Sequence, residues 1–163
     1  MKKYLVKFMP FWSSEVIGII SKICLTYTTI IMGLFGGLAG IIYGGSILLQ
    51  LLPYITKIFD SSKTSLIIEL IFHGFFYILL GFAYIYHYVY ARKGFNLKNH
   101  KYIRKSYLMF GIAWFMYEYT RYGLSLTTLI DGVIVIAIFI IPLIKAEKAF
   151  KNNLIGSYVH EKK

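Results

Sequence analysis

Four long apolar runs, separated by short charged segments, dominate the pattern of hydrophobic and polar positions along the chain. No charged side chain interrupts the first run between Lys22 and Lys57. A helix needs about 20 apolar residues to cross the roughly 30 Å hydrocarbon core of a bilayer. The runs that reach or approach this length cover residues 23–52, 66–90, 107–121 and 126–144. The pattern therefore predicts an all-α integral membrane protein, a four-transmembrane-helix bundle, with residues 1–163 in a single polytopic domain.

The composition points in the same direction. Of the 163 residues, 58% are hydrophobic and only 15% are charged, and the mean hydropathy is +0.63. Soluble domains carry about 25% charged residues, and disordered chains are poor in hydrophobic residues. The composition thus argues against a water-soluble globule and excludes a disordered chain. It also excludes a disulfide scaffold, because Cys24 is the single cysteine of the chain.

The basic residues fall into three clusters, and these predict the orientation of the chain. Short cytoplasmic segments of membrane proteins collect Lys and Arg. Fifteen of the 18 basic residues lie in residues 1–22, 91–106 and 145–163. We therefore expect both termini and the basic loop 91–106 on the cytoplasmic side of the plasma (cell) membrane. The loop is expected to contact lipid headgroups or a protein partner through Arg92, Lys93, Lys98, Lys101, Arg104 and Lys105.

Two alternatives are open for residues 1–22. Aromatic residues alternate with lysines in this segment, and such a composition is typical of a segment that lies in the headgroup region. The same residues are equally compatible with an N-terminal extension of the first span.

Five glycines share one face of the first span. At 3.6 residues per turn they fall within a sector of roughly 100°. Three of them form a doubled small-xxx-small pattern, which lets two helix backbones approach closely. We predict a helix-packing seam, within the chain or between two copies, and a glycine-lined pore or ligand cleft is the alternative. The glycines are Gly33, Gly36, Gly37, Gly40 and Gly44.

Polar side chains recur along one face of the second span. They share a sector of about 100° that runs the full height of the helix. Because polar groups are costly in lipid and face protein or water instead, we expect this stripe to point into the bundle. Its members are Glu69, His73, Tyr77, Tyr84, His87 and Tyr88.

Charged residues of the last two spans extend this polar set. In the four-span topology they share the outer third of the bilayer with Glu69, where one arginine cannot neutralise three carboxylates. We interpret the set as a cluster that holds the helices together or as a proton, cation or substrate site; the remaining alternative is that these groups simply face water. The predicted polar intramembrane site comprises Glu69, His73, Tyr77, Glu118, Arg121 and Asp131.

Tyrosine is abundant, with 15 residues in the chain. Several gather towards the ends of the second and third spans, among them Tyr84, Tyr90, Tyr117 and Tyr122. Amphipathic rings are enriched at the level of the lipid headgroups, so we interpret most of the tyrosines as interfacial.

Signatures of catalysis and cofactor binding are absent from the sequence. It has no HExxH, CxxC or Gly-x-Ser-x-Gly motif and no phosphate-binding loop. We therefore expect no catalytic residue, no metal site and no cofactor. The 14-residue spacing of His73 and His87 resembles that in di-haem cytochromes of the b type. The resemblance implies haem ligation by both histidines, and each iron would need a second axial ligand.

These features favour a non-enzymatic protein that acts through helix–helix contacts as an accessory, assembly or immunity-type subunit. One alternative is a small oligomeric transporter or channel with Glu69, His73, Glu118 and Asp131 as a proton or cation site. A second is a membrane redox carrier that binds haem at His73 and His87. The expected partners are the lipid bilayer and a second copy or another membrane protein. Nucleic acid is not expected, because orientation alone accounts for the basic residues.

Overall fold

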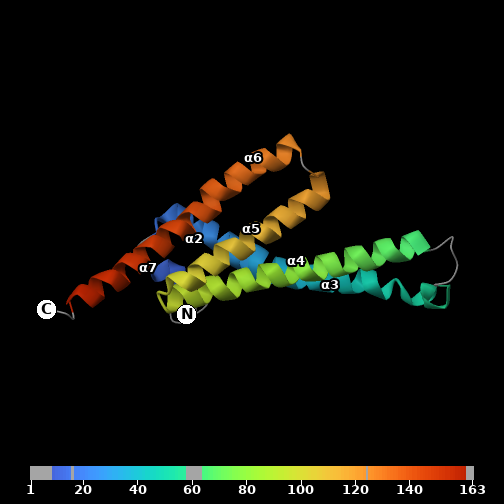
Figure 1. Ribbon diagram of the computed structural model, residues 1–163, viewed down its shortest axis with the longest axis horizontal. Coiled ribbons are helices and arrows are strands. Elements are labelled where there is room, and N and C mark those ends of the chain that lie inside the picture. The colour runs from blue at the N-terminus through green and yellow to red at the C-terminus, as the bar shows by residue number, and fades with distance from the viewer. Residues whose placement is uncertain (1–8, 16, 58–63, 124, 161–163) are drawn as a thin grey trace.

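The computed structural model describes residues 9–15, 17–57, 64–123 and 125–160, and the regular structure within them is helical. The predicted all-α class is confirmed. The described chain forms four helices in an up-and-down order, and the first and last contain π-helical turns, η2 and η4 (Figure 1). In chain order the elements are η1 (Pro10–Ser13), α2 (Ile19–Thr26), η2 (Tyr27–Gly36), α3 (Gly37–Leu49), η3 (Leu52–Lys57), α4 (Thr64–Asn96), α5 (His100–Tyr122), α6 (Leu126–Val135), η4 (Ile136–Ile140) and α7 (Ile141–His160).

Three of the described helices are long and apolar enough to cross a membrane: Ile19–Tyr54, Thr64–Asn96 and Leu126–Asn152. Large apolar side chains such as Ile42 and Val133 are exposed on their outer surfaces. An apolar surface of this extent is unfavourable in water and implies contact with a lipid bilayer. The three helices therefore indicate a multi-pass membrane protein.

The basic segment 91–106, the expected cytoplasmic connection between the second and third spans, is helical except for a turn at 97–99. The helices continue through the basic segment because Phe95 and Ile103 are apolar positions that become buried in it. With 33 residues, α4 is about 50 Å long at 1.5 Å per residue. It is therefore longer than the roughly 30 Å thickness of a hydrocarbon core. It also continues past both ends of the predicted span 66–90.

The turn between α4 and α5 has local support in its own sequence. Lys98 adopts a positive φ of 48°. The Asn99 side chain accepts a hydrogen bond from the Lys101 amide at 2.9 Å and so caps α5. Gly94 lies so close to Ile103 that a Cβ at this position would overlap it. The tight turn thus brings α4 and α5 into contact directly at their connected ends.

A hydrophobic core closes the bundle at this turn, and we call this the closed end. It joins the N-terminal segment, the first helix, both sides of the α4–α5 turn, and α7. A core of this kind fixes the relative positions of segments that are far apart in sequence. Its buried residues are Phe11, Ile17, Leu25, Phe95, Ile103, Leu143, Ala146 and Phe150.

The N-terminal segment folds against the closed end and does not extend the first helix, which begins at Ile19. The Phe11 ring lies 5.8 Å from the Phe95 ring. Trp12 Nε1 donates a hydrogen bond to Thr26 Oγ1 at 2.8 Å. The expectation of an interfacial location stays a prediction. Of the 18 basic residues of the chain, six lie outside the described residues: Lys2, Lys3, Lys7, Lys63, Lys162 and Lys163.

The opposite end of the bundle is open. In Figure 1 the α3–α4 pair and the α5–α6 pair diverge away from the closed end, so the α5–α6 connection lies apart from the start of α4. The contacts agree with this divergence. The helix α4 packs against η2, α3 and α5, whereas α6 packs against α5 and η4. Because the helix pairs diverge, α5 covers the polar side chains of α4 only near the closed end.

Candidate functional site

The glycine face of the first helix lies directly against α4. A Cβ built on Gly37 would come 2.8 Å from the carbonyl oxygen of Gly81. A Cβ built on Gly44 would come 2.5 Å from the carbonyl oxygen of Gly74. No side chain fits at such distances, so the two backbones are in contact.

The glycines that contact α4 are not the doubled small-xxx-small pattern of Gly36, Gly40 and Gly44 that the sequence indicated. Gly36 is exposed, and the nearest atom to a Cβ there is the Ile31 carbonyl oxygen of the same helix, at 3.4 Å. The contacting positions follow a four–three–four spacing, which is typical of helix pairs with a seven-residue repeat. The glycines of the first helix that meet α4 are Gly33, Gly37, Gly40 and Gly44.

The half of the α4 polar stripe nearest the closed end is buried, and it contains Tyr84, His87 and Tyr88. His87 Nδ1 lies 3.0 Å from the Ser106 carbonyl oxygen, and the Ser106 hydroxyl donates to the His87 carbonyl at 3.2 Å. The His87 ring packs 4.9 Å from the Phe110 ring. Among the described residues, His87 Nε2 and the Tyr88 hydroxyl are buried without a hydrogen-bond partner. These contacts join α4 to α5.

The other half of the stripe does not point into the bundle as expected. Glu69 and His73 are exposed, and His73 Nδ1 lies 2.9 Å from the Glu69 carbonyl oxygen of its own helix. Tyr77 is half-buried, with its ring 4.9 Å from that of Tyr43 in an edge-to-face arrangement. The reason is the divergence of the helices, because α5 leaves α4 before it reaches Glu69.

Three charged residues of the predicted site come together near the α5–α6 connection. Glu118 is only 8% exposed, and within the described part of the chain its Oε2 has no hydrogen-bond partner. Its charged neighbours are Asp131 and Arg121. The Arg121 guanidinium is exposed and donates to the Tyr117 hydroxyl at 3.2 Å. The structure thus divides the predicted polar site into two parts. Glu69 and His73 of α4 are exposed and lie apart from the three charged groups near the α5–α6 connection.

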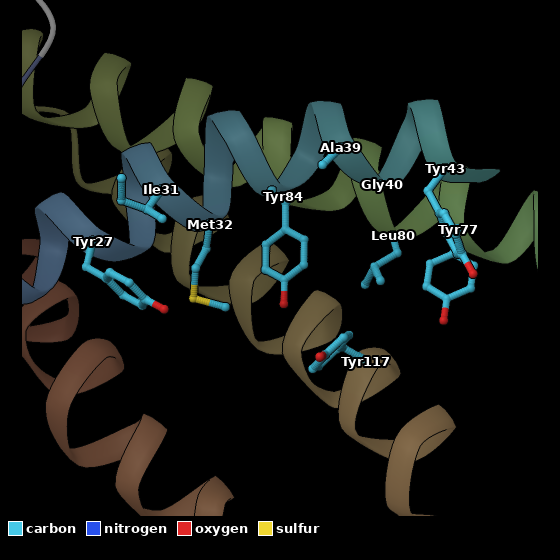
Figure 2. Close-up of a pocket in the computed structure, with 11 residues that line it drawn as sticks. Tyr27, Ile31, Met32, Ala39, Gly40, Tyr43, Tyr77, Leu80, Tyr84 and Tyr117 are labelled. Atoms are coloured by element: carbon cyan, nitrogen blue, oxygen red, sulfur yellow. The ribbon is translucent and has the colours of Figure 1, made fainter. Parts of the chain in front are cut away.

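A cavity of about 680 Å³ lies between the first helix, α4 and α5 (Figure 2). Gly36, Ala39 and Gly40 provide a thin wall on the side of the first helix, and the lining residues include no charged side chain. Five tyrosines from the three helices line the cavity: Tyr27, Tyr43, Tyr77, Tyr84 and Tyr117.

A glycine-lined cleft was predicted only as the alternative to a packing seam, and the tyrosines were not placed around it. Tyr77 and Tyr84 were assigned to the polar face of the second span, and most of the other tyrosines to the membrane surface. Tyr77 and Tyr84 are seven residues apart and share a face of α4. This shared face was the available signal that the two rings line one space.

The basic residues of the α4–α5 connection lie at the surface of the closed end. Lys93, Lys98, Lys101, Arg104 and Lys105 are exposed, and Arg92 is half-buried. Lys105 Nζ lies 5.7 Å from the centre of the Tyr90 ring. Their contact with headgroups or with a partner stays a prediction.

The two histidines of the haem alternative lie in different surroundings. The His87 ring is fully buried against Phe110, whereas His73 is on an exposed face. Two haems on α4 would thus meet a filled core at one histidine and an open surface at the other. The described residues contain no group of three or more His, Cys, Asp and Glu that could hold a metal ion.

Comparisons of the chain with models of known protein families, with characterised proteins and with solved structures give no match. Its function must therefore be inferred from its own residues and geometry.

Proposed function

We propose that the protein crosses the membrane four times, with both termini and the α4–α5 turn in the cytoplasm. The segments that carry most of the basic residues meet in the closed-end core, and Lys and Arg concentrate on the cytoplasmic side. The fourth span is the apolar part of α5 (His100–Tyr122) at 107–121, about 22 Å at 1.5 Å per residue, with Lys101, Arg104 and Lys105 of the same helix on the cytoplasmic side. The helix α5 packs on α4 through buried residues from Ile103 to Ala113.

Cysteine labelling of intact and permeabilised cells tests this topology. In a Cys24→Ser background, Lys98→Cys and Asn152→Cys should react with a membrane-impermeant maleimide only after permeabilisation. Ser65→Cys should react in intact cells. Labelling of positions 98 and 152 from opposite sides of the membrane would contradict four spans.

We infer further that the protein is a non-enzymatic accessory subunit of the plasma membrane that acts through helix–helix contacts. The observation that carries this inference is the open half of α4, where Glu69 and His73 are exposed beside the apolar rings of Phe72 and Phe75. Polar side chains in a bilayer favour contact with protein, and hydrogen bonds between helices stabilise such contacts. A helix of a second copy or of another membrane protein would cover this face.

Site-specific photo-crosslinking in native membranes tests the partner contact. A benzophenone amino acid at Phe72 should give a protein adduct of defined mass. The matched control is the same amino acid at Leu129, an exposed apolar position of α6, which should give lipid adducts. In the Phe72 variant, Glu69→Gln combined with His73→Phe should reduce the protein adduct. Lipid adducts alone at position 72 would overturn the proposal.

A transporter or channel is the second candidate, and Glu118 favours it. This carboxylate is buried, one of its oxygens has no hydrogen-bond partner among the described residues, and Asp131 is its neighbour. Two acids beside one exposed arginine favour binding of a proton or a cation, because repulsion between like charges raises the energy of the doubly ionised pair.

Flux measurements in proteoliposomes distinguish this candidate. Proton or potassium flux should fall at least tenfold in Glu118→Gln and in Asp131→Asn, whereas Glu69→Gln, away from the acidic pair, should retain it. Equal flux in all four proteins, or none in the parent protein, would exclude the acidic pair as a transport site.

A further inference from the structure

We propose that the tyrosine-lined cavity binds a lipid-soluble quinone, a planar ring with two carbonyl oxygens and an apolar tail. This inference goes beyond the helix-contact function and does not depend on it. Phenolic side chains from three helices converge on the cavity, and Figure 2 shows the hydroxyls of Tyr27, Tyr84 and Tyr117 directed towards its space.

The hydroxyl groups of Tyr84 and Tyr117 indicate that the ligand carries hydrogen-bond acceptors. Tyr84 is only 6% exposed, and no described residue offers its hydroxyl a hydrogen-bond acceptor. The Tyr117 hydroxyl accepts a bond from Arg121 at 3.2 Å and keeps its own proton to donate. Donors left without acceptors among apolar walls are unfavourable. A ligand with carbonyl oxygens would satisfy them.

The depth of these donors separates a quinone from the ester carbonyls of glycerolipids. Tyr77 lies near the middle of the span 66–90, and Tyr84 lies six residues, about 9 Å at 1.5 Å per residue, inside its cytoplasmic end, whereas lipid esters lie at the two boundaries of the roughly 30 Å hydrocarbon core. A quinone ring dissolves in the interior of the bilayer and reaches donors at this depth. The flat faces of the tyrosine rings also suit a planar ligand, because aromatic rings stack with an offset.

The size and opening of the cavity agree with such a ligand. Its volume of about 680 Å³ falls in the range of small-molecule sites, about 300–1,000 Å³. Tyr27 and Tyr43 are 52% and 55% exposed, so the cavity is open at its rim on the lipid-facing surface. A ring can therefore enter from the bilayer while its tail remains in lipid.

Photolabelling of the full-length protein in phosphatidylcholine nanodiscs tests the proposal. The probe is an azido-benzoquinone with a decyl chain, and mass spectrometry locates the labelled peptides. Labelling should saturate and map to the cavity-lining helices. Removal of one hydroxyl, in Tyr84→Phe or Tyr117→Phe, should weaken binding about two- to tenfold. Ala39→Phe, which fills the cavity from an exposed helix position, should abolish saturable labelling.

Two neighbouring substitutions serve as controls. Leu38→Phe and Tyr119→Phe alter exposed residues outside the cavity lining and should bind the probe as the parent protein does. Labelling that does not saturate, or that persists in Ala39→Phe, would overturn the proposal. Displacement of the probe by dioleoylglycerol as effectively as by unlabelled decyl-quinone would assign the cavity to glycerolipid esters and overturn the quinone. None of these results alters the cross-linking expected at Phe72.

Discussion

Replacing Gly81 by alanine perturbs the backbone contact that holds α4 to the first helix. The new Cβ would lie 2.5 Å from the Gly37 carbonyl oxygen and 2.9 Å from the Ile41 amide nitrogen, whereas ordinary contact begins at 3.4 Å. Both neighbours are backbone atoms, so the helices must separate. Overpacking of this kind costs about 1–3 kcal/mol, and alanine regains at most about 1 kcal/mol of helix propensity. We expect the free energy of unfolding to fall by about 1–2 kcal/mol.

The assay is unfolding by sodium dodecyl sulfate of the protein in dodecyl maltoside, followed by far-ultraviolet circular dichroism. Gly45→Ala is the matched control, because a Cβ at Gly45 meets nothing within 4 Å. It should be as stable as the parent protein or slightly more stable. If Gly81→Ala and Gly45→Ala unfold at the same mole fraction of dodecyl sulfate, direct backbone contact does not stabilise the α3–α4 pair.

Three further substitutions test the contacts that close the bundle, each measured in the same unfolding assay. Phe11→Ala removes a buried ring from the closed end and should cost about 3–5 kcal/mol; an effect below about 1 kcal/mol would show that the N-terminal segment is not docked there. Ser106→Ala removes a buried hydroxyl between α4 and α5 and should cost about 1 kcal/mol, with no loss expected in the exposed control Ser65→Ala. Tyr107→Phe removes the 2.8 Å hydrogen bond to Glu147 that links α5 to α7. It should cost about 1–2 kcal/mol, and an unchanged midpoint would contradict that link.

The helical class could be predicted from the sequence because lipid restricts the choice of structure. Without water to satisfy backbone groups, a long apolar run must be helical, and the three longest runs are. The faces of the first helix were harder to assign. At 3.6 residues per turn Gly36 falls at the edge of the glycine sector, about 70° from the mean direction of the other four glycines. The sector width alone did not separate it from them, and the structure leaves it exposed.

The charge of the basic segment 91–106 predicted its side of the membrane but not its packing. Phe95 and Ile103 are both buried at the closed end, and a charge pattern does not reveal which helices cover them. The six-residue polar site could not be resolved either. The four-span topology placed Glu69 and Glu118 at similar depth, but the angle between two helix pairs depends on side-chain packing that one sequence does not reveal.

The two sides of α4 explain why one helix pair stays close and the other diverges. Towards the first helix, α4 presents Gly74 and Gly81, and the backbones remain in contact from Gly33 to Gly44 of the first helix. Towards α5 the interface relies on Ser106, Phe110 and Ala113, each fully buried, and the next position along that face is Tyr117. The Tyr117 ring packs at the edge of this interface and forms a wall of the cavity. The divergence of α5 from α4 leaves Glu69 and His73 without cover from α5.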